Sequence, residues 1–138
     1  MAQTAWLKSA LRDSKTIRVP LGTGGVTEGE FAQLGSGLIV FPLRTITAAE
    51  IADEASIATS DYEYYTAVYA AEEIEVTKDT ATADTYAAGA LVYLALSTGK
   101  AETADATGRV LIGHAAEAAV AADTTVKVIF NGQLSAVG

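Results

Sequence analysis

The sequence predicts a mainly β fold with an extended N-terminal arm and at most one short helix. Two observations predict it: short apolar or alternating runs of strand length recur along the chain, and turn residues such as Gly and Asp separate them. With 138 residues, the chain has the length of one domain. We therefore expect an arm over residues 1–14, followed by a single β domain over residues 15–138.

The arm contains a short apolar stripe. Trp6, Leu7 and Leu11 stand at spacings that would place them together if the segment were helical. An isolated helix shorter than about 12 residues is marginal in water. The arm is therefore expected to be either mobile in the free protein or fixed by something that it contacts. A Trp is costly to leave in solvent, which favours an arm that docks.

Two strands are expected in the first third of the chain. The β-rich run TIRVPL, residues 16–21, ends at the glycines of GTGG, because Gly adopts positive φ without steric cost. A second glycine turn, residues 35–37, precedes an apolar run of strand length at residues 38–43.

The middle of the chain is read as a short helix or a long loop, followed by a long strand. Thr47 could cap a helix in which Glu50 completes a capping box. Residues 64–78 alternate between two faces, as a strand requires. Because glutamates stand at positions 72, 73 and 75, we expect the second half of this strand to leave the core.

Three further strands are expected at residues 91–96, 110–118 and 125–130. The turn STGK closes the first of them, and the turn signal Asn131-Gly132 ends the last. In that last strand, valines and Phe130 alternate with Lys127 and Ile129, which is typical of a strand with one buried face.

The composition argues against several classes of function. The net charge is −8 and the nine basic residues form no patch, so we expect no nucleic-acid partner. The absence of Cys removes disulfides and thiolate metal sites. No apolar run within residues 1–19 reaches seven residues, so we expect no signal peptide, no membrane span and a soluble cytosolic product.

Motifs for catalysis or cofactor binding are not found. His114 is the only His, whereas a zinc site needs three or four ligands. The run GTGGVTEG lacks the Lys-Ser/Thr step of a phosphate-binding loop. An acidic group matches no calcium-binding loop and is read as a solvated edge: Glu72, Glu73, Glu75 and Asp79. We predict no catalytic residue, no metal and no cofactor.

The C-terminal third carries several motifs in a characteristic order. A strand ending in V-Y is followed by G-K, T-G, an I-G-x-A-x-E-A-A strand and a V-x-V strand ending in N-G; these lie at residues 88–93, 99–100, 107–108, 112–119 and 126–132. The N-terminal segments TIRVP and GGVTEGEFAQLGSGLIVFPL add to the pattern. With these motifs, residues 15–132 resemble the capsid cement, or decoration, proteins of tailed bacteriophages. The stretch at about residues 44–80 would be an insertion.

The resemblance implies a small β-barrel or β-tulip-like domain and a structural virion protein that is not an enzyme. Such a protein is made in the host cytoplasm and binds the outer surface of the expanded capsid. There it staples neighbouring subunits of the major capsid protein and so stabilises the head. It would act as a homotrimer at three-fold and quasi-three-fold positions.

Two sets of side chains are candidate binding residues. The arm suggests a capsid contact through Trp6, Leu7, Leu11 and Arg12. The alternative function is a surface-displayed carbohydrate-binding or adhesive β-domain, with a stacking platform made of Tyr62, Tyr64, Tyr65 and Tyr69. Cross-strand packing of these tyrosines is the simpler interpretation. A glycosidase is a third alternative, because folding can bring two carboxylates together from distant positions.

Overall fold

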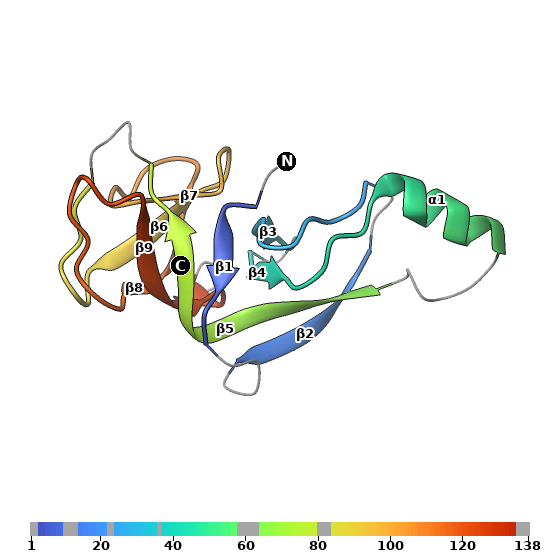
Figure 1. Ribbon diagram of the computed structural model, residues 1–138, viewed down its shortest axis with the longest axis horizontal. Helices are drawn as coiled ribbons and strands as arrows, with labels where there is room; N and C mark the ends of the chain where they lie inside the picture. The colour runs from blue at the N-terminus through green and yellow to red at the C-terminus, as the bar shows by residue number, and fades with distance from the viewer. Residues whose placement is uncertain are drawn as a thin grey trace.

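Strands make up most of the architecture (Figure 1). The computed structural model describes residues 3–9, 14–21, 24–35, 37–57, 64–79 and 84–134, with the helix side chains described up to residue 52. Over these residues the order is β1 (Ala5–Leu7), β2 (Lys15–Pro20), β3 (Ala32–Gln33), β4 (Ile39–Pro42), α1 (Ala48–Ile57), β5 (Tyr64–Thr77), β6 (Leu91–Ala95), β7 (Lys100–Glu102), β8 (Arg109–Ala115) and β9 (Thr125–Asn131). The predicted mainly β fold with one short helix is confirmed.

The 14-residue strand β5 is the centre of the sheet, with antiparallel strands on both of its sides. Ala70 pairs with Lys15 of β2 and with Asn131 of β9, so β2 and β9 lie on opposite sides of β5. The strand β4 lies opposite β2, and β1 lies opposite β9. Consequently β2 and β1 follow each other along one side of β5, and β4 and β9 follow each other along the other side.

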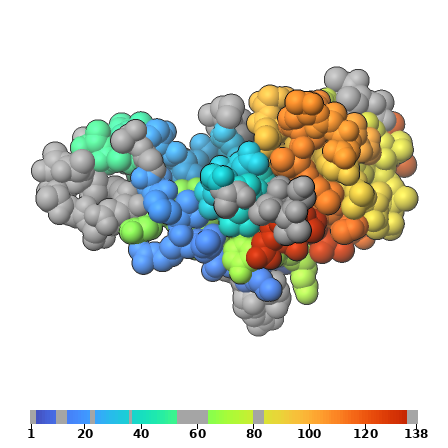
Figure 2. Space-filling view, turned by 180° about the vertical axis from the view of Figure 1, so that it is seen from behind, coloured from blue at the N-terminus to red at the C-terminus, as the bar shows by residue number. Residues whose placement is uncertain are grey.

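The rest of the sheet curls into a half-barrel. From β9 it continues through β8 and β6 to β7. The strand β7 returns to the end of β5, where the backbone N–H of Asp79 donates to the carbonyl of Ala101 at 3.0 Å. Figure 1 shows this curled half beside an extended part made of β2, the start of β5 and α1. Figure 2 shows the same two parts from behind, a rounded C-terminal half and a narrower extension.

Two apolar cores correspond to these two parts. The larger core lies inside the curl and takes alternate residues of β9, namely Val126, Val128 and Phe130. The smaller core lies under the extension and contains Val19, Val40, Ile46, Tyr65 and Ala67. Alternation along the strands explains this distribution, because successive side chains point to opposite faces.

The predicted helix cap is confirmed. The hydroxyl of Thr47 accepts a hydrogen bond from the backbone N–H of Glu50 at 3.2 Å. In return, the carboxylate of Glu50 accepts one from the N–H of Thr47 at 3.4 Å. This reciprocal pair is a capping box, and it begins α1 at Ala48.

One expectation is wrong. The second half of β5 stays in the core, because Ile74 and Val76 are buried while Glu75 between them points outward. Around Trp6 the arm is extended, and it pairs with β5 as the strand β1. Residues 10–13 and 61–63 lie outside the described part. Whether residues 44–80 are an insertion stays a prediction, although β5 within them forms the centre of the sheet.

Candidate functional site

The strand β1 holds Trp6 on the outside of the sheet. Its neighbour Ala5 is buried, and Leu7 packs against the larger core, whereas the side chain of Trp6 is 39% exposed. Successive residues of a strand point to opposite faces, so a buried Ala5 directs Trp6 outward. Of the four predicted capsid contacts, Trp6 therefore lies on the surface and Leu7 packs against the larger core. Leu11 and Arg12 lie outside the described residues.

Hydrogen bonds on both sides fix the backbone of β1. The N–H of Ala5 donates to the carbonyl of Gly29 at 3.1 Å. The carbonyl of Thr4 accepts from the N–H of Thr77 at 2.8 Å, and the N–H of Lys8 donates to the carbonyl of Glu73 at 3.0 Å. Of the two expectations for the arm, residues 3–9 fit the one in which the arm is fixed by what it contacts. Trp6 is thus presented by an ordered strand.

Trp6 begins a row of outward side chains across three strands. It lies opposite Glu75 of β5, and Glu75 lies opposite Lys127 of β9. The carboxylate of Glu117 lies 3.3 Å from the Lys127 ammonium. This hydrogen-bonded ion pair with Glu117, together with the charges of Glu73 and Glu75, raises the pKa of Lys127 above its ordinary value.

A second outward row lies next to the first. Leu91 of β6 lies opposite His114 of β8, and His114 lies opposite Ile129 of β9. Leu91 and Ile129 are 45% and 50% exposed. Because Lys127 and Ile129 are two residues apart on β9, they share the outer face, and the two rows adjoin. We call the following six residues the outer rows: Trp6, Glu75, Lys127, Leu91, His114 and Ile129.

Only part of this surface could be predicted from the sequence. The outward direction of Ile129 follows from the alternation already noted in β9. Leu91 stands in the continuous apolar run LVYLAL, and such a run does not reveal which face is buried. For His114, the sequence indicated a position in a strand but not the outward direction of the side chain.

A recess lies next to Thr4, the residue before β1. The recess has a volume of about 310 Å³ and is lined by Thr4, Glu30, Phe31, Leu96, Thr98, Gly99 and Lys100. The buried hydroxyl of Thr4 has no hydrogen-bond partner among the described residues. A partner side chain that enters the recess could supply one.

The tyrosines of the alternative platform do not share one face. Tyr65 is buried in the smaller core, and this burial raises its pKa. Its neighbour Tyr64 is exposed on the other face, where the guanidinium carbon of Arg18 lies 4.8 Å from the ring centroid. Tyr69 packs half-buried against the smaller core, and Tyr62 lies outside the described residues. The described tyrosines thus show cross-strand and core packing.

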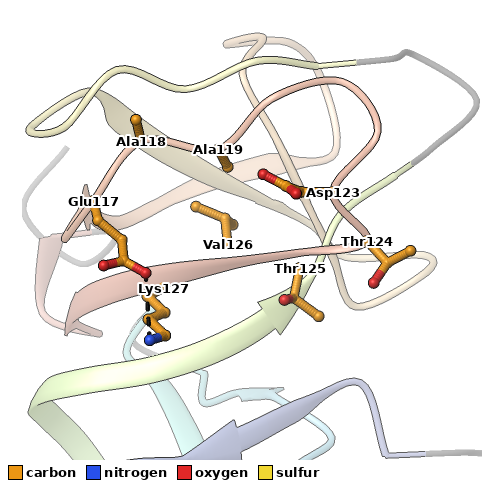
Figure 3. Close-up of a pocket in the computed structure, with 8 residues that line it drawn as sticks. All are labelled: Glu117, Ala118, Ala119, Asp123, Thr124, Thr125, Val126 and Lys127. Carbon is orange, nitrogen blue, oxygen red and sulfur yellow. Dashed lines mark ion pairs between the residues drawn. The ribbon is translucent and has the colours of Figure 1, made fainter.

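A polar hollow of about 260 Å³ lies between the turn after β8 and the start of β9 (Figure 3). Its charged groups are already engaged in structural contacts. Glu117 pairs with Lys127, and the carboxylate of Asp123 accepts a hydrogen bond from the N–H of Val120 at 2.8 Å. These contacts hold the turn together.

The described part of the chain holds neither of two general features, a metal-binding cluster and a membrane-spanning helix. It holds no group of three or more His, Asp or Glu side chains that could bind a metal ion. None of its helices is long and apolar enough to cross a membrane.

Comparison with known proteins identifies the family. No curated protein and no solved structure matches the chain. A family model described as phage cement protein matches residues 11–130, which is most of the chain. The match begins before β2 and ends within β9, so it includes β5 and the parts of the outer rows on β6, β8 and β9. The chain therefore belongs to the phage cement protein family, a family of structural, capsid-associated proteins.

Proposed function

We propose that this protein binds the outer surface of the expanded phage capsid and staples neighbouring subunits of the major capsid protein. It acts without catalysis and stabilises the head. It is made in the host cytoplasm and binds as a homotrimer at three-fold and quasi-three-fold positions. The family supports the capsid association, and the fold supports the mode of binding.

The observation that carries the proposal is the exposure of Trp6 on a strand that is itself firmly held. Burying the exposed part of a Trp side chain removes roughly 100 Å² of mainly apolar surface from water, which contributes about 2 kcal/mol. Because β1 is already ordered, this gain is not offset by the entropy of folding an arm. Trp6 therefore has the properties of an interface anchor.

Several weak contacts can still give a firm attachment. Each protomer offers a small set of outward apolar side chains: Trp6, Leu91 and Ile129. When three protomers are joined, binding of the first raises the effective concentration of the others at their sites. A trimer thus converts modest contacts into stable attachment across the seam between capsid subunits.

The charge of the protein fits this location. A net charge of −8 keeps many copies on one shell soluble and does not attract the packaged nucleic acid. The carbohydrate-binding alternative gains no comparable support, because Tyr64 and Tyr65 point to opposite faces of β5.

Co-sedimentation with empty expanded capsids of the same phage tests the proposal. We expect the wild-type protein to pellet with capsids at a fixed ratio, and Trp6→Ala to bind at least about 10-fold more weakly. The matched control is Val120→Ala, because Val120 is 59% exposed but lies in the turn after β8, outside the outer rows. Light scattering of the free protein measures whether it is a trimer.

Two results would overturn the proposal. One is a folded wild-type protein that stays in the supernatant at every concentration tested. The other is turnover of a substrate by the purified protein that a single Asp or Glu substitution abolishes.

A further inference from the structure

Among the described residues, only β5 pairs with β2, so one edge of β2 has no partner strand there. Five of its six residues are exposed, and Val19 is the buried one. β2 is the longest described strand that has a neighbour on one side only. An open edge of this kind is a template on which another chain can pair.

The hydrogen-bonding pattern shows which backbone groups face the open side. The carbonyl of Thr66 accepts a hydrogen bond from the N–H of Leu43, on the side of β5 away from β2. Arg18 lies opposite Thr66. In an antiparallel ladder, opposite residues either bond to each other or both point away. The N–H and C=O of Arg18 therefore point to the open side, whereas those of Ile17 and Val19 point toward β5.

The usable part of this edge is short. The register between β2 and β5 shifts between Lys15 and Thr16, and a bulge of this kind interrupts regular pairing. At the other end, Pro20 has no N–H to donate. Both features limit pairing at an edge, so the open template consists of Thr16, Ile17, Arg18 and Val19.

The side chains of β2 indicate the chemistry of a matching strand. β2 contains Lys15 and Arg18 and no carboxylate, although the chain as a whole carries a net charge of −8. Opposite charges stabilise a cross-strand pair, whereas like charges oppose it. On the other face of β2, Ile17 is 36% exposed. A strand that alternates acidic and apolar residues would place its acidic residues beside Arg18 and its apolar residues beside Ile17.

From these observations we infer that the Thr16–Val19 edge of β2 binds a short, extended, acidic segment of the capsid subunit by β-strand addition. This inference deepens the proposed function and rests on it. A second copy of β2 is a poorer occupant, because it brings two more positive charges to the same seam. The added strand supplies backbone hydrogen bonds, and Trp6 supplies an apolar anchor further along the same side of β5.

A proline substitution tests the backbone contact directly. Arg18→Pro removes an N–H that points to the open side, and leaves the N–H groups that bond to β5 in place. The matched control is Arg18→Ala, which loses the same side chain and keeps the N–H. We expect Arg18→Pro to bind expanded capsids at least about 10-fold more weakly than Arg18→Ala, since a hydrogen bond and the fit of the strand are both lost. Circular dichroism checks that both variants are folded.

The outcomes separate this inference from the proposed function. If wild-type protein does not pellet with capsids, the proposed function fails. If wild type pellets and folded Arg18→Pro binds as well as Arg18→Ala, the inference about β2 is wrong. It is also wrong if Arg18→Pro changes the mass of the free protein but not capsid binding, because the edge then pairs with a second copy.

A charge reversal at Arg18 tests the inference independently, in case the proline variant does not fold. Arg18→Glu keeps every backbone donor and opposes an acidic strand. We expect it to bind at least about 10-fold more weakly than Arg18→Ala, with the difference shrinking at high salt. Equal binding by the two variants would overturn the acidic character of the partner.

Discussion

At the scale of single residues, Tyr86 has an unusual environment. Its side chain is buried in the larger core, and its hydroxyl has no hydrogen-bond partner among the described residues. Burial, and then the negative charges of Asp84 and Glu102, raise the pKa of Tyr86 far above 10. The folded protein therefore keeps this phenol neutral under conditions in which an unfolded tyrosine ionises.

This residue predicts a pH dependence of stability. The folded pKa is higher than the unfolded one, so the contribution of Tyr86 is complete below pH 10 and is lost as the pH rises beyond it. At pH 11 the wild type should have lost roughly 1 kcal/mol of unfolding free energy through this group. Tyr86→Phe cannot ionise and removes an unpaired buried hydroxyl. We expect it to be at least as stable as wild type at pH 7 and to lose less stability at pH 11.

Urea unfolding of both proteins at pH 7, 9 and 11 measures the difference. If the two free energies fall in parallel between pH 9 and 11, the phenol of Tyr86 is not held neutral by the fold.

At the scale of elements, α1 depends on its first turn. The helix has only ten residues and lies at the end of the extension, so tertiary packing gives it limited support. The reciprocal hydrogen bonds of Thr47 and Glu50 satisfy two of the backbone N–H groups that a helix start leaves unpaired.

Removing this cap should weaken α1 locally. Thr47→Ala loses the hydroxyl that accepts from Glu50, which costs about 1 kcal/mol. Amide exchange at Glu50 and Ile51 should then become about 5-fold faster, while exchange in β5 is unchanged. Thr47→Ser is the matched control because Ser caps equally well. Equal exchange rates in the Ala and Ser variants would show that the box does not stabilise the helix.

Elements with a complete local signal could be predicted from the sequence, and the others could not. The capping box and the alternation of β9 are encoded within a few neighbouring residues. β1 has three residues, too few for any periodicity, and its conformation is imposed by pairing with β5. The burial of the second half of β5 could not be predicted, because glutamates suggest exposure although they occupy one face and Ile74 and Val76 the other. The register between β5 and β9 is also irregular near Ala71, and this shifts the inward–outward alternation of the side chains.

The candidate site was predictable to the same extent. Trp6 was singled out by its cost in solvent, and it does lie on the surface. Its neighbour Leu7 was expected beside it, but a strand places the two on opposite faces. Pro20 is a local indication that β2 is an edge strand, because a Pro within a sheet is confined to edges. Which segment the open edge faces is decided by neighbours in space rather than by local pattern.

At the scale of the whole molecule, one glycine ties the two cores together. Gly132 is buried where the end of β9 meets β4 and β5. Its N–H donates to the carbonyl of Tyr69 at 2.7 Å, and its carbonyl accepts from the N–H of Ile39 at 3.1 Å. Tyr69 packs on the smaller core, and Ile39 belongs to the larger one. The residue predicted as a turn thus also joins the curled half to the extension.

Replacing this glycine should destabilise both halves at once. A Cβ at Gly132 would overlap the carbonyl oxygen of Ile39, and a backbone atom cannot move aside as a flexible side chain can. Gly132→Ala must therefore separate β4 from the end of β9, and we expect a loss of about 3 kcal/mol or more in unfolding free energy. The control Gly35→Ala has no atom within 4 Å of the added Cβ and should change stability by less than about 1 kcal/mol.

Urea unfolding followed by both tryptophan fluorescence and far-ultraviolet circular dichroism measures the loss. The two signals should shift together, because Trp6 and the extension are connected through β5. If only one signal shifts, or if Gly132→Ala is as stable as Gly35→Ala, the two cores are not coupled through this junction.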